Sequence, residues 1–338
     1  MNSLINNRIE WIDTVKGFGI ILVVYGHNFP LLENYIYTFH MPLFFLIAGL
    51  FHPNKITSTI IKKRAQQILI PYFLWSSLLF LFWYALGRHF GESKAMNLSV
   101  FKNLFGVFYA QGDIEYMNWG IPMWFLPAIF LSFLIFGYIL KFKQKVHQII
   151  IAVILIIIGF LIPKLTDFHL VWSLDVVLVS LVFYAIGYYF KAFILSDKMQ
   201  YQKPVLLLFF IVHLFISIFF ENKVDMYRSN YGNELLFILN GITGVFFWIL
   251  LFKTIKKIPI LFFFGKHTIP VLAMQVRALT LIKALLLFIF NYKNFNFTEL
   301  EIVIITIAQL CIMYLAILFI NKKFPILNGK RKALERGI

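Results

Sequence analysis

The stretch DTVKGFGIILVVYGH, residues 13–27, is typical of a membrane-spanning helix, yet it carries ionisable side chains near both ends. Ionisable groups at membrane depth are costly and usually face a protein interior or a water-filled cavity. Lys16 and His27 are eleven residues apart, so a helix places them on one face, roughly 16 Å apart along its axis. Asp13 lies one turn before Lys16 and can pair with it. Two interpretations follow. Either Lys16 and His27 form a functional site along one face of the helix, or Lys16 extends to the lipid headgroups and His27 forms a hydrogen bond with a neighbouring helix.

Three glycines in this stretch, Gly17, Gly19 and Gly26, lower its intrinsic stability as a helix. Membrane helices tolerate small residues of this kind where another element packs closely against the backbone. We therefore expect close packing against this helix.

The composition of the chain indicates a polytopic membrane protein. Its 338 residues are 61% hydrophobic and 19% aromatic, and only 14% are charged. A soluble domain of this size has too little interior to bury so much apolar surface. The single cysteine, Cys311, excludes an internal disulfide, and its apolar surroundings favour a packing role over a reactive one.

Apolar runs of helical length predict an all-α integral membrane protein with about ten transmembrane helices. These runs lie at 13–29, 36–52, 68–87, 121–141, 147–163, 172–190, 204–220, 234–252, 267–290 and 301–320. The second run is short, and its length also allows a re-entrant segment. The connection 88–120 is too long for a simple turn, so we expect a partly ordered surface element with an interfacial helix.

The net charge of +16 is distributed unevenly along the chain. Lys and Arg gather in alternate connections, at 55–64, 141–145, 191–203 and 253–266, and after residue 321. The other connections hold most of the acidic residues. This asymmetry follows the positive-inside rule, and it places the basic connections and both termini in the cytoplasm. Membrane insertion accounts for the basic balance, so no nucleic-acid partner is expected.

Several motifs resemble, in the same order, those of one family of membrane enzymes. WIDTVKGFGIILVVYGH has the family's spacing of a basic residue, ten residues and a histidine. It is followed by TFHMPLFFLIAGLF, KKRAQQILIPYFLW, MWFLPAIF, LVFYAIGYYF and FFGKHTIPVLAMQ. Together they resemble the membrane-bound acyltransferase-3 family, nearest its short sugar O-acetyltransferase branch with fucose 4-O-acetylase-like proteins. The resemblance spans nearly the whole chain and implies a single domain, 1–338, with no appended soluble domain.

The resemblance implies an enzyme of the bacterial inner membrane that moves an acetyl group from acetyl-CoA to a carbohydrate hydroxyl. The expected acceptor is a surface or exported glycan, or its lipid-linked precursor. A histidine within reach of a hydroxyl removes its proton as general base or carries the acyl group itself, and His27 is the candidate for either role. Lys16, with Asp13 beside it, occupies the family's basic position, where the usual residue is Arg. Lysine keeps the charge but loses the bidentate geometry.

Basic residues on the expected cytoplasmic side are candidates for binding the anionic CoA donor. Lys62 and Lys63 are either donor contacts or topology signals alone. Arg64 matches the first arginine of the family's paired-arginine element, whereas Gln67 stands at the position of the second.

Two polar residues of the ninth apolar run are further candidates for donor binding. Gln275 and Arg277 lie about 12–15 Å along this helix from its cytoplasmic end, at a depth near that of His27. Arg277 cannot be neutralised cheaply, so we expect it to line the cavity near a phosphate or a carbonyl. Many relatives carry histidine at the position of Gln275. Either residue is a candidate donor to an oxyanion.

Three residues near the expected outer side are candidates for acceptor binding. His40 is either an interfacial helix cap or an acceptor contact, and Trp124 is either part of an aromatic belt or a platform for a sugar ring. Asp175 either caps a helix or accepts a hydrogen bond from an acceptor hydroxyl. The remaining histidines are interpreted as structural or solvated: His52, His89, His147, His169, His213 and His267. No spacing typical of a metal site is present, so no metal is expected.

Two alternatives remain open from the sequence. A polysaccharide or small-solute transporter also uses scattered ionisable residues inside the membrane, although no pair of helix-broken segments in matching halves supports that interpretation. A succinyl or longer-chain transferase would use the same machinery with a longer pocket, which the sequence does not define.

Overall fold

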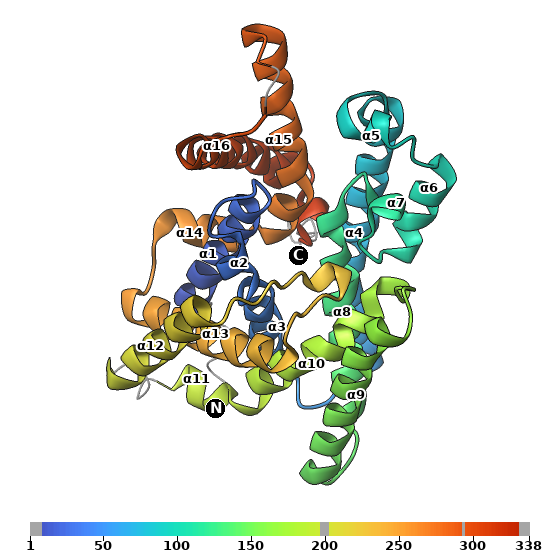
Figure 1. The fold of residues 1–338 in the computed structure, drawn as a ribbon. Helices are drawn as coiled ribbons and strands as arrows, with labels where there is room; N and C mark the ends of the chain where they lie inside the picture. The colour runs from blue at the N-terminus through green and yellow to red at the C-terminus, as the bar shows by residue number, and fades with distance from the viewer. Residues whose placement is uncertain (1–8, 197–202, 293–294, 331–338) are drawn as a thin grey trace, which may run out of the picture.

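The structure is a computed structural model that describes residues 9–196, 203–292 and 295–330 (Figure 1). Throughout these ranges the regular elements are helices, and the sole β feature is one antiparallel bridge between Asp225 and Asn230. The predicted all-α class is therefore confirmed.

Seven of the described helices are long and apolar enough to cross a membrane, so the chain is a multi-pass membrane protein. They are built on α4 (Ser58–Ala85), α8 (Phe125–Ile139), α9 (Lys145–Leu165), α10 (Leu174–Tyr189), α13 (Glu234–Ile255), α15 (Thr268–Phe290) and α16 (Glu299–Lys323). The other three expected spans are shorter helices: α1 (Glu10–Gly26), α3 (His40–Leu50) and α12 (Lys203–Phe219). A total of ten spans and cytoplasmic termini remain predictions.

The first helix, α1, lies inside the bundle against α14 (Pro259–Gly265). A Cβ atom on Gly17 would lie 1.7 Å from the carbonyl oxygen of Leu261, and one on Gly265 would lie 1.7 Å from that of Asp13. Only glycine allows two helix backbones to approach so closely. The close packing expected against this helix is confirmed.

At the centre of the bundle, α3 is almost completely buried and packs against α10. Gly49 and Gly187 permit this contact, because a Cβ atom on either would lie 2.0 Å from a carbonyl oxygen of the other helix. With 11 residues, α3 is roughly 16 Å long, about half the thickness of the hydrocarbon core. It therefore runs through the interior without matching the bilayer in length.

The long connection predicted as a partly ordered surface element contains several short helices. They are η2 (Gly87–His89), α5 (Gly91–Ala95), α6 (Val100–Tyr109) and α7 (Ile114–Met117). Ser99 caps α6 by accepting a hydrogen bond from the backbone of Lys102. Four apolar side chains of α6 are exposed: Phe101, Leu104, Phe105 and Phe108. This pattern fits a helix lying in the membrane interface, and that location remains a prediction.

A second connection, residues 220–233, crosses the front of the bundle from α12 towards α8 in Figure 1. The Asp225–Asn230 bridge closes a short turn within it. Asn222 holds the base of this turn, because its amide nitrogen donates to the carbonyls of Tyr231 and Asn233. Ser229 attaches the turn to α10 through a hydrogen bond of 2.6 Å to Asp175.

Candidate active site

His27 directly follows the last residue of α1, and its side chain is fixed by that helix. Its Nδ1 lies 2.6 Å from the carbonyl oxygen of Val23. Because a carbonyl oxygen only accepts hydrogen bonds, Nδ1 must carry the proton. The lone pair of the neutral imidazole is then on Nε2, and no described residue forms a hydrogen bond to that atom. His27 is therefore arranged as a proton acceptor.

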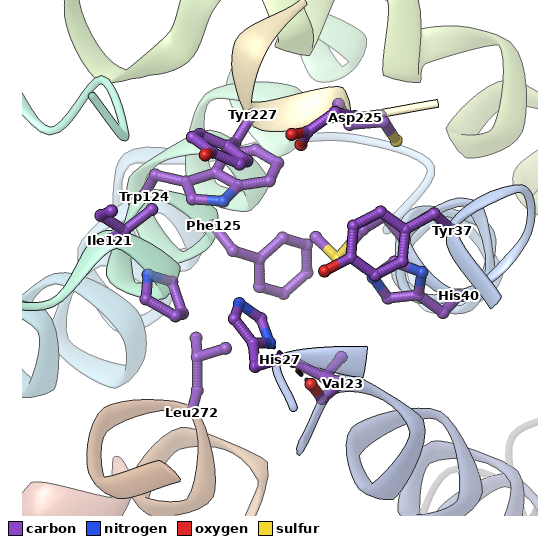
Figure 2. Close-up of a pocket in the computed structure, with 13 residues that line it drawn as sticks. Val23, His27, Tyr37, His40, Ile121, Trp124, Phe125, Asp225, Tyr227 and Leu272 are labelled. Carbon is purple, nitrogen blue, oxygen red and sulfur yellow. Dashed lines mark hydrogen bonds between the residues drawn. The ribbon is translucent and has the colours of Figure 1, made fainter. Parts of the chain in front are cut away.

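The imidazole of His27 points into a cavity of about 50 Å³, which we call the first cavity (Figure 2). Residues from α1, α2 (Glu33–Tyr37), α3, η3 (Ile121–Trp124), α8, α15 and the connection 220–233 meet there. The lining comprises Val23, His27, Tyr37, His40, Met41, Ile121, Pro122, Trp124, Phe125, Asp225, Met226, Tyr227 and Leu272. The fold thus brings together three residues predicted from the sequence, His27, His40 and Trp124.

His40 repeats the arrangement of His27 on a second helix. Its Nδ1 lies 2.8 Å from the carbonyl oxygen of Ile36, so the same argument places the proton on Nδ1. Tyr37 lies between the two histidines, with its ring 5.0 Å from that of His40 and its hydroxyl 3.5 Å from the carbonyl oxygen of Gly26. The first cavity therefore contains two imidazoles of the same tautomer.

Asp225 is a residue of the first cavity that the sequence analysis missed. It lies in the connection 220–233, and its side chain is 24% exposed. Burial raises the pKa of Asp225 to about 6, although Arg228, with its Nε 3.8 Å away, acts in the opposite direction. The carboxylate faces the cavity across from His27 (Figure 2). No local motif marks this position, because only the tertiary fold brings the connection over the histidines.

Tyr227 and Trp124 form an aromatic wall on one side of the first cavity (Figure 2). Both pack against Gly112, whose Cβ position would lie 3.3 Å from the ring of Tyr227 and 3.4 Å from that of Trp124. Gly112 has a φ of +86°, which favours glycine at this position. Tyr37 and Tyr227, like Asp225, were not predicted from the sequence.

The family model described as an acyltransferase domain matches residues 9–321 of the chain. The chain belongs to this acyltransferase family. The predicted resemblance is thereby confirmed. A curated relative, the nodulation protein NolL of Sinorhizobium fredii (strain NBRC 101917 / NGR234), is 34% identical over 147 residues. The match covers 38% of this chain and only 36% of NolL. No solved structure matches the chain.

At the far end of α1 from His27, the structure contains the predicted ion pair. Lys16 Nζ lies 3.1 Å from Asp13 Oδ1, and the Asp13 side chain is only 7% exposed. The pairing expected from the sequence is confirmed, and a role of this pair in acyl transfer remains a prediction.

The basic residues predicted to bind the donor lie on the first turns of α4. Lys62 and Lys63 are exposed, and Arg64 is half-buried with its guanidinium 5.9 Å from the ring centre of Phe133. The ring of His52, which follows α3, lies 5.1 Å from the same phenylalanine. Because His40 begins α3, this basic cluster and the first cavity are separated by the length of α3, roughly 16 Å.

Arg277 supports the aromatic wall of the first cavity through the backbone. Its Nη2 donates to the carbonyl oxygens of Asn118 at 3.0 Å and Trp119 at 2.8 Å. These residues immediately precede η3 (Ile121–Trp124), which places Trp124 in the first cavity. Arg277 thus fixes the backbone that leads into the cavity wall. Its contact with the donor remains a prediction.

Gln275 belongs to a chain of buried amides beside His27. Its backbone oxygen accepts from Gln309 at 3.0 Å, and Gln309 Oε1 accepts from Asn28 at 2.7 Å. Asn28 also donates to Thr306 at 2.8 Å. Two buried oxygens, Gln275 Oε1 and Asn28 Oδ1, have no hydrogen-bond partner among the described residues. Asn28 follows His27 directly, so an amide next to the key histidine was the signal that the sequence analysis overlooked.

Asp175 is buried and bonded within the protein. Its Oδ2 accepts from Ser229 at 2.6 Å and lies 3.0 Å from His169 Nδ1. The hydrogen bond to Asp175 raises the pKa of His169. Asp175 does not appear among the residues that line the first cavity, and its contact with an acceptor remains a prediction. Among the described residues no group of three or more His, Cys, Asp and Glu is placed to hold a metal ion.

Proposed function

We propose that the protein is a membrane-embedded O-acetyltransferase of the bacterial inner membrane. It moves the acetyl group of acetyl-CoA to a hydroxyl of a surface or exported glycan, or of its lipid-linked precursor. The observation that supports this most strongly is the unpaired Nε2 of His27 beside a cavity that also holds a carboxylate and an aromatic wall. The match to an acyltransferase domain supplies the class of reaction.

In the proposed reaction, His27 acts as general base. The acceptor oxygen bonds to the acetyl carbonyl carbon while its proton passes to His27 Nε2. The carbon–sulfur bond then breaks, and the CoA thiolate leaves and takes up that proton. The bond from Nδ1 to Val23 orients the ring and keeps Nε2 unprotonated before the reaction. An imidazole that instead carried the acetyl group would use the same free nitrogen.

The first cavity supports a carbohydrate as the acceptor. Asp225 accepts hydrogen bonds when ionised, and sugar hydroxyls supply such donors in pairs. Trp124 and Tyr227 offer apolar faces on which a pyranose ring packs. His40 Nε2 is a second acceptor that selects the hydroxyl presented to His27.

For the donor, we propose that the CoA nucleotide docks on Lys62, Lys63 and Arg64. These side chains begin α4, and two of them are exposed, so they form an anion-binding surface outside the hydrocarbon core. The pantetheine arm then reaches inward along α3 to His27. We propose that Lys16, which pairs with Asp13 at the start of α1, lies on this route.

The experiment that tests this function uses purified full-length protein in proteoliposomes. Acetyl-CoA labelled in the acetyl group is supplied with glycan or lipid-linked saccharide extracted from the host membrane. We expect label to appear in an alkali-labile ester, with release of one CoA thiol for each ester formed. Export of an unmodified glycan without thiol release would contradict the proposal and favour a transporter.

A further inference from the structure

A second, larger cavity lies beside His27 and plays no part in the reaction as described. Its volume is about 280 Å³, and it is formed by the end of α1, by α15, by residues 295–297 and by the start of α16. It is lined by His27, Asn28, Phe29, Leu279, Lys283, Phe295, Asn296, Phe297, Ile302 and Ile305. His27 is the residue shared by the two cavities. A ligand in the second cavity therefore reaches the imidazole without crossing another wall.

Lys283 makes the second cavity attractive to an anion. It is a half-buried cation within α15, one of the helices long enough to span the membrane. Its Nζ lies 5.4 Å from the ring centre of Phe295, and no carboxylate within the described ranges forms an ion pair with it. An ionisable side chain within a candidate membrane span and without a counter-ion is a candidate for a functional site.

Two amide side chains, those of Asn28 and Asn296, line the second cavity beside Lys283. Asn28 is only 8% exposed, and its amide nitrogen donates to Thr306 and Gln309. Asn296 is exposed. A cation flanked by amide groups suits a phosphate attached to a saccharide, whose hydroxyl groups form hydrogen bonds with amides.

The second cavity lies between α15 and α16, two helices at the periphery of the bundle. In Figure 1, α15 and α16 project from the body of the bundle. Their outer side chains are exposed and apolar, among them Leu281, Leu285, Ile304 and Ile307. In a multi-pass membrane protein such a surface contacts lipid. A ligand anchored in the bilayer can therefore approach the second cavity from the side.

We propose that the second cavity binds the phosphate of a lipid-linked saccharide, with Lys283 as its counter-ion. This inference rests on the proposed acetyl transfer at His27 and specifies the acceptor. The phosphate lies against Lys283, the first sugar lies beside Asn28 and Asn296, and the saccharide extends past His27 into the first cavity. The phosphates of CoA share the same chemistry, so the test must separate the two sources.

The test compares two phosphate probes on purified full-length protein in a neutral detergent. Dodecyl phosphate represents a lipid phosphate, CoA represents the donor, and dodecanol corrects for binding of the alkyl chain. Lys283→Gln is expected to weaken binding of dodecyl phosphate by about tenfold, the loss typical of one charge-assisted contact, while CoA binding stays unchanged. Lys322→Gln, which removes an exposed lysine of α16, should leave both unchanged.

Two results would overturn the inference. One is binding of dodecyl phosphate that is equally strong in Lys283→Gln and Lys322→Gln. The other is loss of CoA binding alone, which would assign the cation to the donor. If Lys283→Gln does not fold, Asn296→Asp replaces it, because Asn296 is exposed and a carboxylate there must repel phosphate. Unchanged binding of dodecyl phosphate by Asn296→Asp would equally refute the site.

The inference and the proposed function fail separately. A wild-type protein that transfers acetyl groups but shows no Lys283-dependent binding of dodecyl phosphate would retain the function and lose the inference. A protein that binds dodecyl phosphate through Lys283 without forming any acetyl ester would do the reverse.

Discussion

His27 and His40 show how single residues prepare this site. Each donates Nδ1–H to a carbonyl oxygen four residues earlier, at 2.6 Å and 2.8 Å. These bonds fix the tautomer and leave each Nε2 as an acceptor. The residues that sequence motifs predicted, His27, His40 and Trp124, meet in one cavity, whereas Asp225 entered it from a connection without any motif. Side-chain types within helices are predictable, but the path of an irregular connection depends on contacts distant in sequence.

At this scale we predict that Asp225→Asn raises the KM for the acceptor by about tenfold, because an amide accepts weaker hydrogen bonds than a carboxylate. The KM for acetyl-CoA should not change. Steady-state kinetics with each substrate varied in turn measures both values. An equal rise in both KM values would indicate general distortion rather than acceptor recognition.

The pKa of Asp225, raised to about 6, predicts a pH dependence of acceptor binding. The ionised form is the hydrogen-bond acceptor, so binding should strengthen as pH rises from 5 to 7, by about tenfold for a single group with this pKa. Arg228, Glu33 and Tyr227 also act electrostatically on this region. Asp225→Asn keeps those groups. The pH profile of acceptor binding by this variant should therefore lose only the transition centred near pH 6. Identical profiles of the two proteins would contradict the assignment.

Among the elements, α1 depends on glycine for its position. The alanine Cβ of Gly17→Ala would overlap the carbonyl of Leu261, which is backbone and cannot move aside cheaply. We predict a loss of about 3 kcal/mol or more in stability, seen as a lower Tm and less monodisperse protein. Gly87→Ala is the control, because its nearest neighbour, Trp83, would lie at an ordinary 3.4 Å. Equal stability of the two variants would disprove the close contact.

The connection 220–233 is attached to α10 through Asp175, which joins Ser229 and His169. Bonding to Asp175 raises the pKa of His169. A raised pKa contributes stability that is complete below pH 6.5 and disappears as pH rises through the folded value. His169→Gln should therefore lower Tm by about 2 °C at pH 6 and by less at pH 8. His147→Gln, at an exposed position, should change Tm at neither pH. A Tm difference between wild type and His169→Gln that increased with pH would contradict this prediction.

On the scale of the whole molecule, charge distribution predicts which side each connection faces, and the helices alone do not decide it. With Cys311→Ser as background, a cysteine replacing Lys62 should react with an impermeant maleimide only from the cytoplasm. A cysteine replacing Arg228 should react only from outside. Both positions are exposed. Labelling of both from the same side would refute the predicted topology.

The sequence predicted the helical class, the family and the position of nearly every long helix, because apolar periodicity and length are local properties. It did not predict that Arg277 would bond the carbonyls of Asn118 and Trp119. An arginine within a membrane-spanning segment is expected at a functional site, yet its two partners belong to a connection 158 and 159 residues earlier in the sequence. For the same reason, the two cavities that meet at His27 could not be foreseen from spacing.

The most direct measurement is acetyl transfer by His27→Gln in proteoliposomes, compared with wild type and with His89→Gln, which changes an exposed histidine. If His27 Nε2 is the base, kcat should fall by at least about 100-fold, while acetyl-CoA binding and the elution of the folded protein remain those of wild type. His89→Gln should keep full activity. Transfer by His27→Gln at the wild-type rate would contradict the central role of His27.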